Sequence, residues 1–262
     1  MVWRRRGLRA VALGVAGVLT FLVIWQLAPT LGWVNGTYFP PATEVLARLG
    51  QFTLDLNYWR TIGNTLLTWA IGLAIAAVLA LVLGTVIGLV PTLRRYTRST
   101  IEFLRPIPSV AIIPLAILMF GLDRDASLVI VVFATFWQVL IQVLYGVGDV
   151  DPVARDTLRS FGLGPMSQFT HLVLPTALPY VMTGIRLGAT VALILTVTGE
   201  LLIGADGIGR LLTTRATAGD YAGVYALVVT AGVLALIINL GIRAIERRAL
   251  AWHQSVRAEV VL

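Results

Sequence analysis

Residues 149–179, DVDPVARDTLRSFGLGPMSQFTHLVLPTALP, form a polar segment between two long apolar runs, and the interpretation of the whole chain starts from this segment. Structureless loops longer than about 12–15 residues are uncommon and are usually functional. The local signals here predict two short helices instead. Asp151 is suited to cap a helix that begins at Pro152, and Gly162 is suited to end it, because glycine accepts the left-handed conformation of a helix terminus. Pro165 can begin the second helix.

The first of these predicted helices has a mixed surface. Val153, Leu158 and Phe161 can gather on one face, whereas the charged side chains lie elsewhere on the helix. An apolar patch on a short polar helix is typical of a docking element for a soluble partner. The alternative is a solvated loop of a membrane protein with two chance prolines.

The spacing within this segment resembles the cytoplasmic loop of bacterial ABC-importer permeases. That loop has the pattern E-A-A, three residues, Gly, nine residues, then I-x-L-P. Here Gly162 is followed after nine residues by LVLP, which ends in Leu174 and Pro175. Asp156 stands for the glutamate, while Thr157 and Leu158 replace the alanines. This departure is similar to the nitrate/sulfonate/taurine-type branch of these permeases, as are the FPPATEVLARL stretch at 39–49 and the Pro-rich RPIP run at 105–108.

The composition indicates a membrane protein. The 262 residues are 58% hydrophobic and only 13% charged, with mean hydropathy +0.87. Soluble domains are nearer a quarter charged. In a soluble protein the net charge of +7 would suggest nucleic-acid binding, but its distribution between apolar runs favours membrane topology as the explanation. The absence of cysteine excludes disulfides and thiolate metal sites.

Six apolar runs predict six membrane spans. They cover residues 10–31, 64–90, 105–122, 126–147, 178–204 and 221–242. The first run is longer than the 7–15 apolar residues of a signal peptide, which is the alternative, so we expect a retained helix. The third is short and holds Pro106, Pro108 and Pro114, which favours a place inside the bundle; the alternative is a kinked packing helix with no transport role. Gly84 and Gly88 in the second span predict close helix packing.

These spans divide the chain and set its predicted orientation. The parts are a cytoplasmic N-terminus 1–9, a first transmembrane helix 10–31, an external segment with an amphipathic helix 32–63, a transmembrane core 64–242 with a coupling loop 149–177, and a cytoplasmic tail 243–262. With the N-terminus inside, fourteen of the twenty arginines fall in cytoplasmic segments, as the positive-inside rule requires. Residues 206–220 are predicted to be an external loop.

Four polar residues inside the predicted spans are candidates for the transport pathway or for helix pairing. Gln138 and Gln142 are four residues apart and therefore share a helix face. Arg186 and Glu200 lie in the fifth span, within a G-x-R-L…E-x-L-x-G pattern that also resembles the permease family. Ionisable groups in a membrane span usually face protein or water. Both roles stay open for all four residues.

The resemblance implies an all-α membrane protein with six transmembrane helices and short cytoplasmic coupling helices between the fourth and fifth, the fold of a type I ABC importer permease. It implies a second permease copy, two ATPase subunits that hold ATP and Mg, and an extracytoplasmic substrate-binding protein. It also implies a bacterial inner-membrane location with both termini cytoplasmic. The implied ATPase-coupling residues are Asp156, Leu158, Phe161, Gly162, Leu174 and Pro175.

The branch suggests sulfonate, taurine, nitrate or a related small molecule as the solute. The alternatives are an osmoprotectant or amino-acid importer permease and, from another class, a membrane enzyme or scaffold. The sequence holds no phosphate-binding loop and no nucleophile elbow, and its two histidines, His171 and His253, have no ligand partners at metal-binding spacing. We therefore expect no catalytic residue, no metal or other cofactor on this chain, and no nucleic-acid partner.

Overall fold

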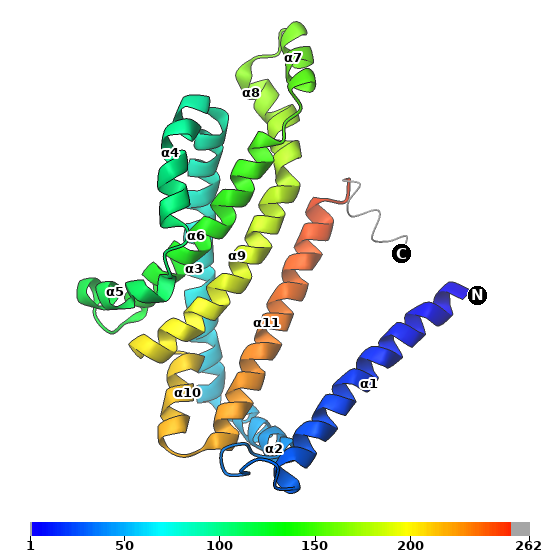
Figure 1. Cartoon of the computed structure of the whole chain (residues 1–262), viewed down its shortest axis with the longest axis vertical. Helices are drawn as coiled ribbons and strands as arrows, with labels where there is room; N and C mark the ends of the chain where they lie inside the picture. The colour runs from blue at the N-terminus through cyan, green and yellow to red at the C-terminus, as the bar shows by residue number, and fades with distance from the viewer. Residues whose placement is uncertain (1, 253–262) are drawn as a thin grey trace. The chain divides into compact units, whose positions relative to one another are not determined.

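The computed structural model describes residues 2–252, with side chains from residue 12 onward, and is helical throughout this part of the chain (Figure 1). The helices in chain order are α1 (Val2–Thr30), α2 (Ala42–Thr53), α3 (Leu56–Leu89), α4 (Pro91–Leu104), η1 (Ser109–Ile112), α5 (Ile113–Phe120), α6 (Arg124–Gly148), α7 (Pro152–Ser160), α8 (Pro165–Gln168), η2 (Phe169–Val173), α9 (Leu174–Ile203), α10 (Ile208–Thr217) and α11 (Tyr221–Ala249). The predicted all-α fold is confirmed. The described residues form two compact units, one within residues 2–60 and 211–232 and the other within residues 61–210 and 233–252.

The larger unit is organised around the antiparallel pair α6 and α9, drawn green and yellow-green in Figure 1. Glycines let the two backbones approach closely along this pair. A Cβ on Gly146 would lie 2.9 Å from the backbone of Ala177, and one on Gly184 would lie 3.3 Å from the backbone of Val139. Near the other end, Gly199 lies against Ser127. Small residues at these levels allow tight packing of membrane helices, for which dispersion forces are a main source of stability.

Helix α3 packs against α6 through a second glycine seam. A Cβ on Gly84 would lie 2.8 Å from a methyl carbon of Val143, and a Cβ on Gly88 would lie 2.8 Å from one of Val147. The constant offset between the paired residues means that α3 and α6 run parallel and in register. The predicted close packing at Gly84 and Gly88 is confirmed.

The predicted third span is not one straight helix. The chain from α4 to α5 is bent by 84°, between Pro91–Leu104 and Ser109–Phe120. Pro106 and Pro108 lie at the bend, where proline removes backbone donors and disfavours helix in the preceding residue. Among the described residues five helices are long and apolar enough to cross a membrane, and this bent pair makes a sixth if it is counted as one span.

The smaller unit contains the amphipathic helix that the sequence predicted after Pro40 and Pro41. Helix α2 buries Ala42, Val45 and Phe52, and beside it Trp25, Phe39 and Tyr225 form an aromatic cluster. Residues 206–220, for which the sequence predicted an external loop, include the ten-residue helix α10. The sequence did not reveal this helix because it is short and mostly polar.

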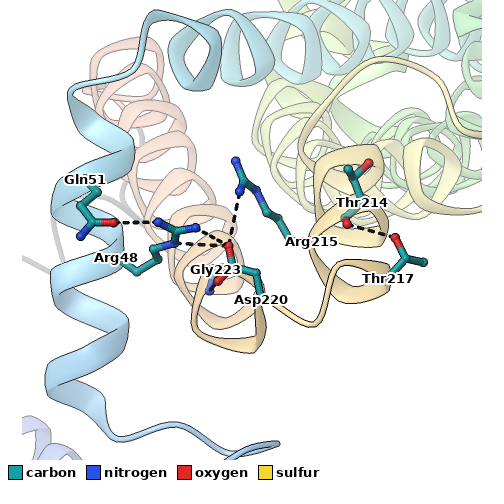
Figure 2. A network of polar contacts seen from close by, with 7 residues as sticks. All are labelled: Arg48, Gln51, Thr214, Arg215, Thr217, Asp220 and Gly223. Atoms are coloured by element: carbon teal, nitrogen blue, oxygen red, sulfur yellow. Dashed lines mark hydrogen bonds and ion pairs between the residues drawn. The ribbon is translucent and has the colours of Figure 1, made fainter.

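An ion-pair network joins α2 to the segment that follows α10 (Figure 2). The Asp220 carboxylate accepts hydrogen bonds from Arg48 at 2.6 Å and from the Gly223 backbone N–H at 2.9 Å, and Arg215 lies 3.4 Å away. Burial alone would raise the pKa of Asp220, but the hydrogen bonds from Arg48 and Gly223 and the charges of the two arginines outweigh it, so the pKa lies below its usual value. Arg48 and Arg215 also lie over the Phe52 ring.

Candidate functional site

Helix α7 projects from the end of the α6–α9 pair, and local interactions fix where it begins and ends (Figure 1). The Asp151 side chain accepts a hydrogen bond from the Val153 N–H at 2.8 Å, which caps the helix. At the other end, the Gly162 N–H donates to the Arg159 carbonyl at 2.9 Å and the next N–H donates to the Leu158 carbonyl at 3.1 Å. This pair of bonds is the Schellman motif, and it requires the positive φ of 74° found at Gly162.

The chain after α7 is tied into the helix that follows. The Gln168 amide donates to the Leu163 carbonyl at 2.7 Å, which holds α8 against the turn. Helices α8, η2 and α9 then run on without a break, and η2 is a turn of π-helix. Val173, at the end of η2, is buried in the same apolar core as Val150, which precedes α7. Both ends of the polar segment are therefore anchored in the α6–α9 core.

Three large apolar side chains are exposed along α7, just after it and in α8. The exposed fractions of Val153, Phe161 and Met166 are 71%, 78% and 74%. Leu158 is half-buried, whereas Asp156 is exposed and forms an ion pair with Arg159 at 3.4 Å. The sequence did not single out Met166; its place just after Pro165, in the first turn of α8, is the signal that could have found it.

The remaining predicted coupling residues, Leu174 and Pro175, lie in the first turn of α9. Leu174 is exposed, and Pro175 lines a hollow of about 500 Å³ at the base of the polar segment. The other lining residues are Asp149, Thr176, Pro179, Tyr180, Thr183 and Trp252. Across it the Tyr180 hydroxyl donates to the Asp149 carboxylate at 2.8 Å, which joins the end of α6 to the start of α9.

Glu200 lies near the opposite end of α9 and is fully buried. One oxygen of its carboxyl group accepts a hydrogen bond from the Thr65 hydroxyl at 3.0 Å and another from the Gly209 N–H at 3.0 Å. The Thr65 hydroxyl in turn accepts from the Ile208 N–H at 2.9 Å. A Cβ at Gly207 would overlap the carboxyl group. The turn before α10 thus closes over Glu200 and joins α9 to α3.

Arg186 joins α9 to α11. Its guanidinium group lies 3.1 Å from the Glu246 carboxylate, and both side chains are partly buried. The two glutamines of α6 are half-buried, and the Gln142 side chain packs over Gly184, which leaves room for it. In the described part of the chain no hydrogen bond joins the side-chain amide of Gln138 or Gln142 to another residue. The structure therefore brings Arg186 and Glu200 to separate helix contacts, not to one shared site.

The side chains of residues 12–252 include no group of three or more His, Cys, Asp or Glu that could hold a metal ion. His171 lies at the surface, with its Nδ1 2.9 Å from the Ser167 carbonyl oxygen, and His253 lies outside the described residues. The features that remain for function are the projecting, apolar-tipped segment 151–175 and the polar groups inside the helix bundle.

Residues 72–250 match the sequence profile of a protein family described as binding-protein-dependent transport system inner membrane component. The taurine transport system permease protein TauC of Escherichia coli strain K12 is 28% identical over 264 residues, which cover 97% of this chain and 94% of that protein. The putative aliphatic sulfonates transport permease protein SsuC of the same organism is 27% identical, and the match covers 88% of this chain and 88% of that protein. The bicarbonate transport system permease protein CmpB of Synechococcus elongatus is 27% identical, with 79% of this chain and 77% of that protein covered.

Solved structures with the same fold include permeases of quite different importers. One is a chain of the MetNI methionine ABC transporter in an inward facing conformation, with a TM-score of 0.64, 18% identity, and coverage of 74% of this chain and 96% of that chain. Another is a chain of a bacterial ABC transporter involved in the import of the acidic polysaccharide alginate, with a TM-score of 0.64, 16% identity, and coverage of 94% and 98%. At such low identities the likeness concerns the fold alone.

Proposed function

Because the chain belongs to the family of binding-protein-dependent transport system inner membrane components, we propose that it imports a small sulfonate or related small anion, driven by a separate ATPase chain. It is an ABC importer permease, and its fold is that of the type I importers. The observation that carries the mechanism is the capped, apolar-tipped helix α7, which projects from the end of the α6–α9 pair.

In the proposed mechanism, segment 151–175 is the coupling element that the ATPase grips. A ligand shifts a conformational equilibrium only by its differential affinity for the two states, so the coupling element has to keep its shape while it is moved. The Asp151 cap and the Gly162 turn give α7 that stiffness. Phe161 and Leu158 supply apolar contacts, and Asp156 supplies a charge on the exposed side. Leu174 and Pro175 pass the displacement to α9.

The small-anion assignment rests on relatives whose names state a transported solute. The taurine and sulfonate permeases match over most of their length, and the bicarbonate permease also carries a small anion. Gln138 and Gln142 are the candidates for solute contact, because their side-chain amides are half-buried and have no hydrogen bond within residues 12–252. Arg186 and Glu200 are assigned to helix pairing. The second candidate, an amino-acid importer, is supported by fold similarity to a methionine transporter and to an amino acid transporter, at 18% and 17% identity.

The proposed assembly has two copies of this chain, two ATPase subunits with ATP and Mg, and an extracytoplasmic binding protein, all in a bacterial inner membrane. Both termini are proposed to be cytoplasmic, since the arginines concentrate on that side of the predicted topology. Within the chain, we propose a coupling loop at 149–177 in a transport core at 64–242, preceded by the external segment 32–63.

The test is transport by the assembled importer in liposomes. The permease is purified with its ATPase subunits and reconstituted with the binding protein, and ATPase activity and uptake are measured with taurine, an alkanesulfonate, nitrate, bicarbonate, methionine and glycine betaine. We expect stimulation by one of the first four. Stimulation only by methionine or glycine betaine would reject the solute class, and a permease that co-purifies with no ATPase subunit would reject the mechanism.

A further inference from the structure

A second hollow in the larger unit, of about 350 Å³, lies between α3, α4 and α6 and is rich in arginine. Its lining residues are Ile87, Arg94, Arg98, Ile101, Glu102, Arg105, Ile141, Leu144 and Tyr145. Arg94 and Arg98 are four residues apart in α4, and Arg105, seven residues further on, directly follows the last residue of this helix, so all three lie toward one side of it. With one glutamate among them, they leave the hollow a net charge of +2.

Two of the three guanidinium groups have no ion-pair partner. Arg98 pairs with Glu102 at 2.8 Å, but no ion pair joins Arg94 or Arg105 to any side chain among residues 12–252. The guanidinium nitrogens of Arg94 lie 3.2 Å from the place of a Cβ on Gly148, the last residue of α6. Arg94 is therefore held at the carbonyl end of α6, at the same end of the α6–α9 pair as α7.

The rest of the hollow is largely apolar. Isoleucine and leucine side chains from α3, α4 and α6 line it. A suitable occupant therefore combines a negative head with hydrocarbon chains. A soluble anion would leave this apolar lining uncovered.

We propose that this hollow binds the headgroup of an anionic phospholipid, with the phosphate among its arginines and the acyl chains against the isoleucine and leucine side chains that line it. The guanidinium fork matches phosphate oxygens in a bidentate way. Basic pockets between membrane helices on the cytoplasmic side are suited to anionic headgroups. The hollow includes no residue of the coupling segment, and its test measures lipid binding without transport, so the failure of this proposal can be distinguished from the failure of the proposed solute class and coupling mechanism.

The experiment uses the full permease–ATPase complex in detergent and titrates it with dioctanoyl phosphatidylglycerol, dioctanoyl phosphatidylcholine or inorganic phosphate. The readout is the concentration at half-maximal thermal stabilisation. We expect saturable stabilisation by phosphatidylglycerol alone. Arg94→Gln with Arg105→Gln should raise its midpoint about thirtyfold, which corresponds to about 2 kcal/mol at about 1 kcal/mol per basic residue.

The control is Arg95→Gln with Arg247→Gln, which removes the same charge from exposed positions that do not line the hollow. Its midpoint should stay within threefold of the wild type. An equal rise in both variants, or equal stabilisation by inorganic phosphate, would overturn the proposal. Loss of the ATPase subunits from the Arg94/Arg105 variant with an unchanged lipid response would overturn it in favour of a protein-docking surface.

If the glutamine variant does not assemble, Arg94→Lys with Arg105→Lys replaces it. Lysine keeps both charges but loses the planar fork, so the phosphatidylglycerol midpoint should rise three- to tenfold. An unchanged midpoint in this variant would overturn the proposal.

Discussion

The sharpest prediction concerns Gly162, the residue that ends α7. Its φ is +74°, and no heavy atom lies within 4 Å of the place where a Cβ would be built. A substitution there meets no neighbour, so its effect comes from backbone conformation alone. We predict that coupling falls in the order Gly, Asn, Ala, Val, because Asn tolerates the left-handed region and a β-branched residue tolerates it least.

The magnitude follows from the two ways in which the chain can accept an alanine. It can keep the left-handed conformation, which costs about 1–2 kcal/mol. It can also abandon the two hydrogen bonds of the Schellman turn, at 2.9 and 3.1 Å, each worth about 0.5–1.5 kcal/mol. The first route lowers the ratio of ordered to disordered α7 about 5- to 30-fold and the second, at about 1–3 kcal/mol in total, about 5- to 160-fold. The chain takes the less costly route, so we expect a decrease of about 5- to 30-fold. A nine-residue helix is marginal on its own, so it has little reserve against this loss.

Two measurements check this prediction in the reconstituted complex. Amide hydrogen exchange across residues 152–163 should accelerate by that factor in Gly162→Ala, and ATPase activity stimulated by the loaded binding protein should fall while the basal activity stays. The matched control is Gly164→Ala. Gly164 is equally exposed and has no neighbour near its Cβ position, but its φ is −69°, so alanine fits without strain.

Three outcomes would refute the reasoning. Normal stimulated activity in Gly162→Val would mean that the end of α7 does not transmit the signal. An equal loss in the Asn and Ala variants would point to recognition of the bare backbone by the partner instead of helix stability. A loss in Gly164→Ala as large as that in Gly162→Ala would mean that the segment tolerates no side chain at all.

The other predictions test the helix contacts and the ion-pair network. Gly207→Ala places a methyl group in the space of the buried carboxyl and should lower the free energy of unfolding by about 1–3 kcal/mol in thermal or denaturant melts, whereas Gly232→Ala, which has open space, should not. A double-mutant cycle with Arg186→Gln and Glu246→Gln should give a coupling energy of about 0.5–3 kcal/mol, and a value near zero would contradict their pairing. The lowered pKa of Asp220 means that its ionised form stabilises the fold fully above about pH 4 and that this stability is lost as the pH falls through the lower folded-state pKa. Protection of residues 211–223 from hydrogen exchange should therefore stay constant above about pH 4 and decrease as the pH falls below it, and Asp220→Asn should remove that dependence.

The features that the sequence predicted well are those with local causes. Asp151, Pro152 and Gly162 set the bounds of α7 through contacts with residues at most five positions away. The spans were predictable because apolar runs of this length have few alternatives. The bend between α4 and α5 was less predictable from the sequence. Prolines predict a break in a helix, but the angle of 84° depends on packing that lies elsewhere in the chain.

The candidate site residues were recognisable by type but not by partner. Glu200 and Arg186 were evident as ionisable groups in a span, but Thr65 and Glu246, which pair with them, are 135 and 60 residues away. The only local signal for the first pair is the glycine spacing in GADGIG at 204–209, where Gly207 makes room for the carboxyl group. Contacts between residues so far apart in the chain give no signal in the amino-acid composition or in the hydrophobic periodicity.

The way the polar segment is anchored decides where energy from a partner can go. Val150 before α7 and Val173 after it are buried in the same core. Beyond them the backbones of α6 and α9 are in close contact at glycines, so the two helices cannot move closer together. Because close-packed interiors have low compressibility, a displacement of α7 is passed on to α6 and α9 and is not taken up by local deformation at either end of the segment. The turn at Gly162 is held by two backbone hydrogen bonds and by the bond from the Gln168 amide to the Leu163 carbonyl, and no heavy atom lies within 4 Å of the place of a Gly162 Cβ, so its stiffness depends on these bonds and on the backbone conformation. Stiffening or loosening that turn should alter coupling more than substitutions in the buried core that leave it intact.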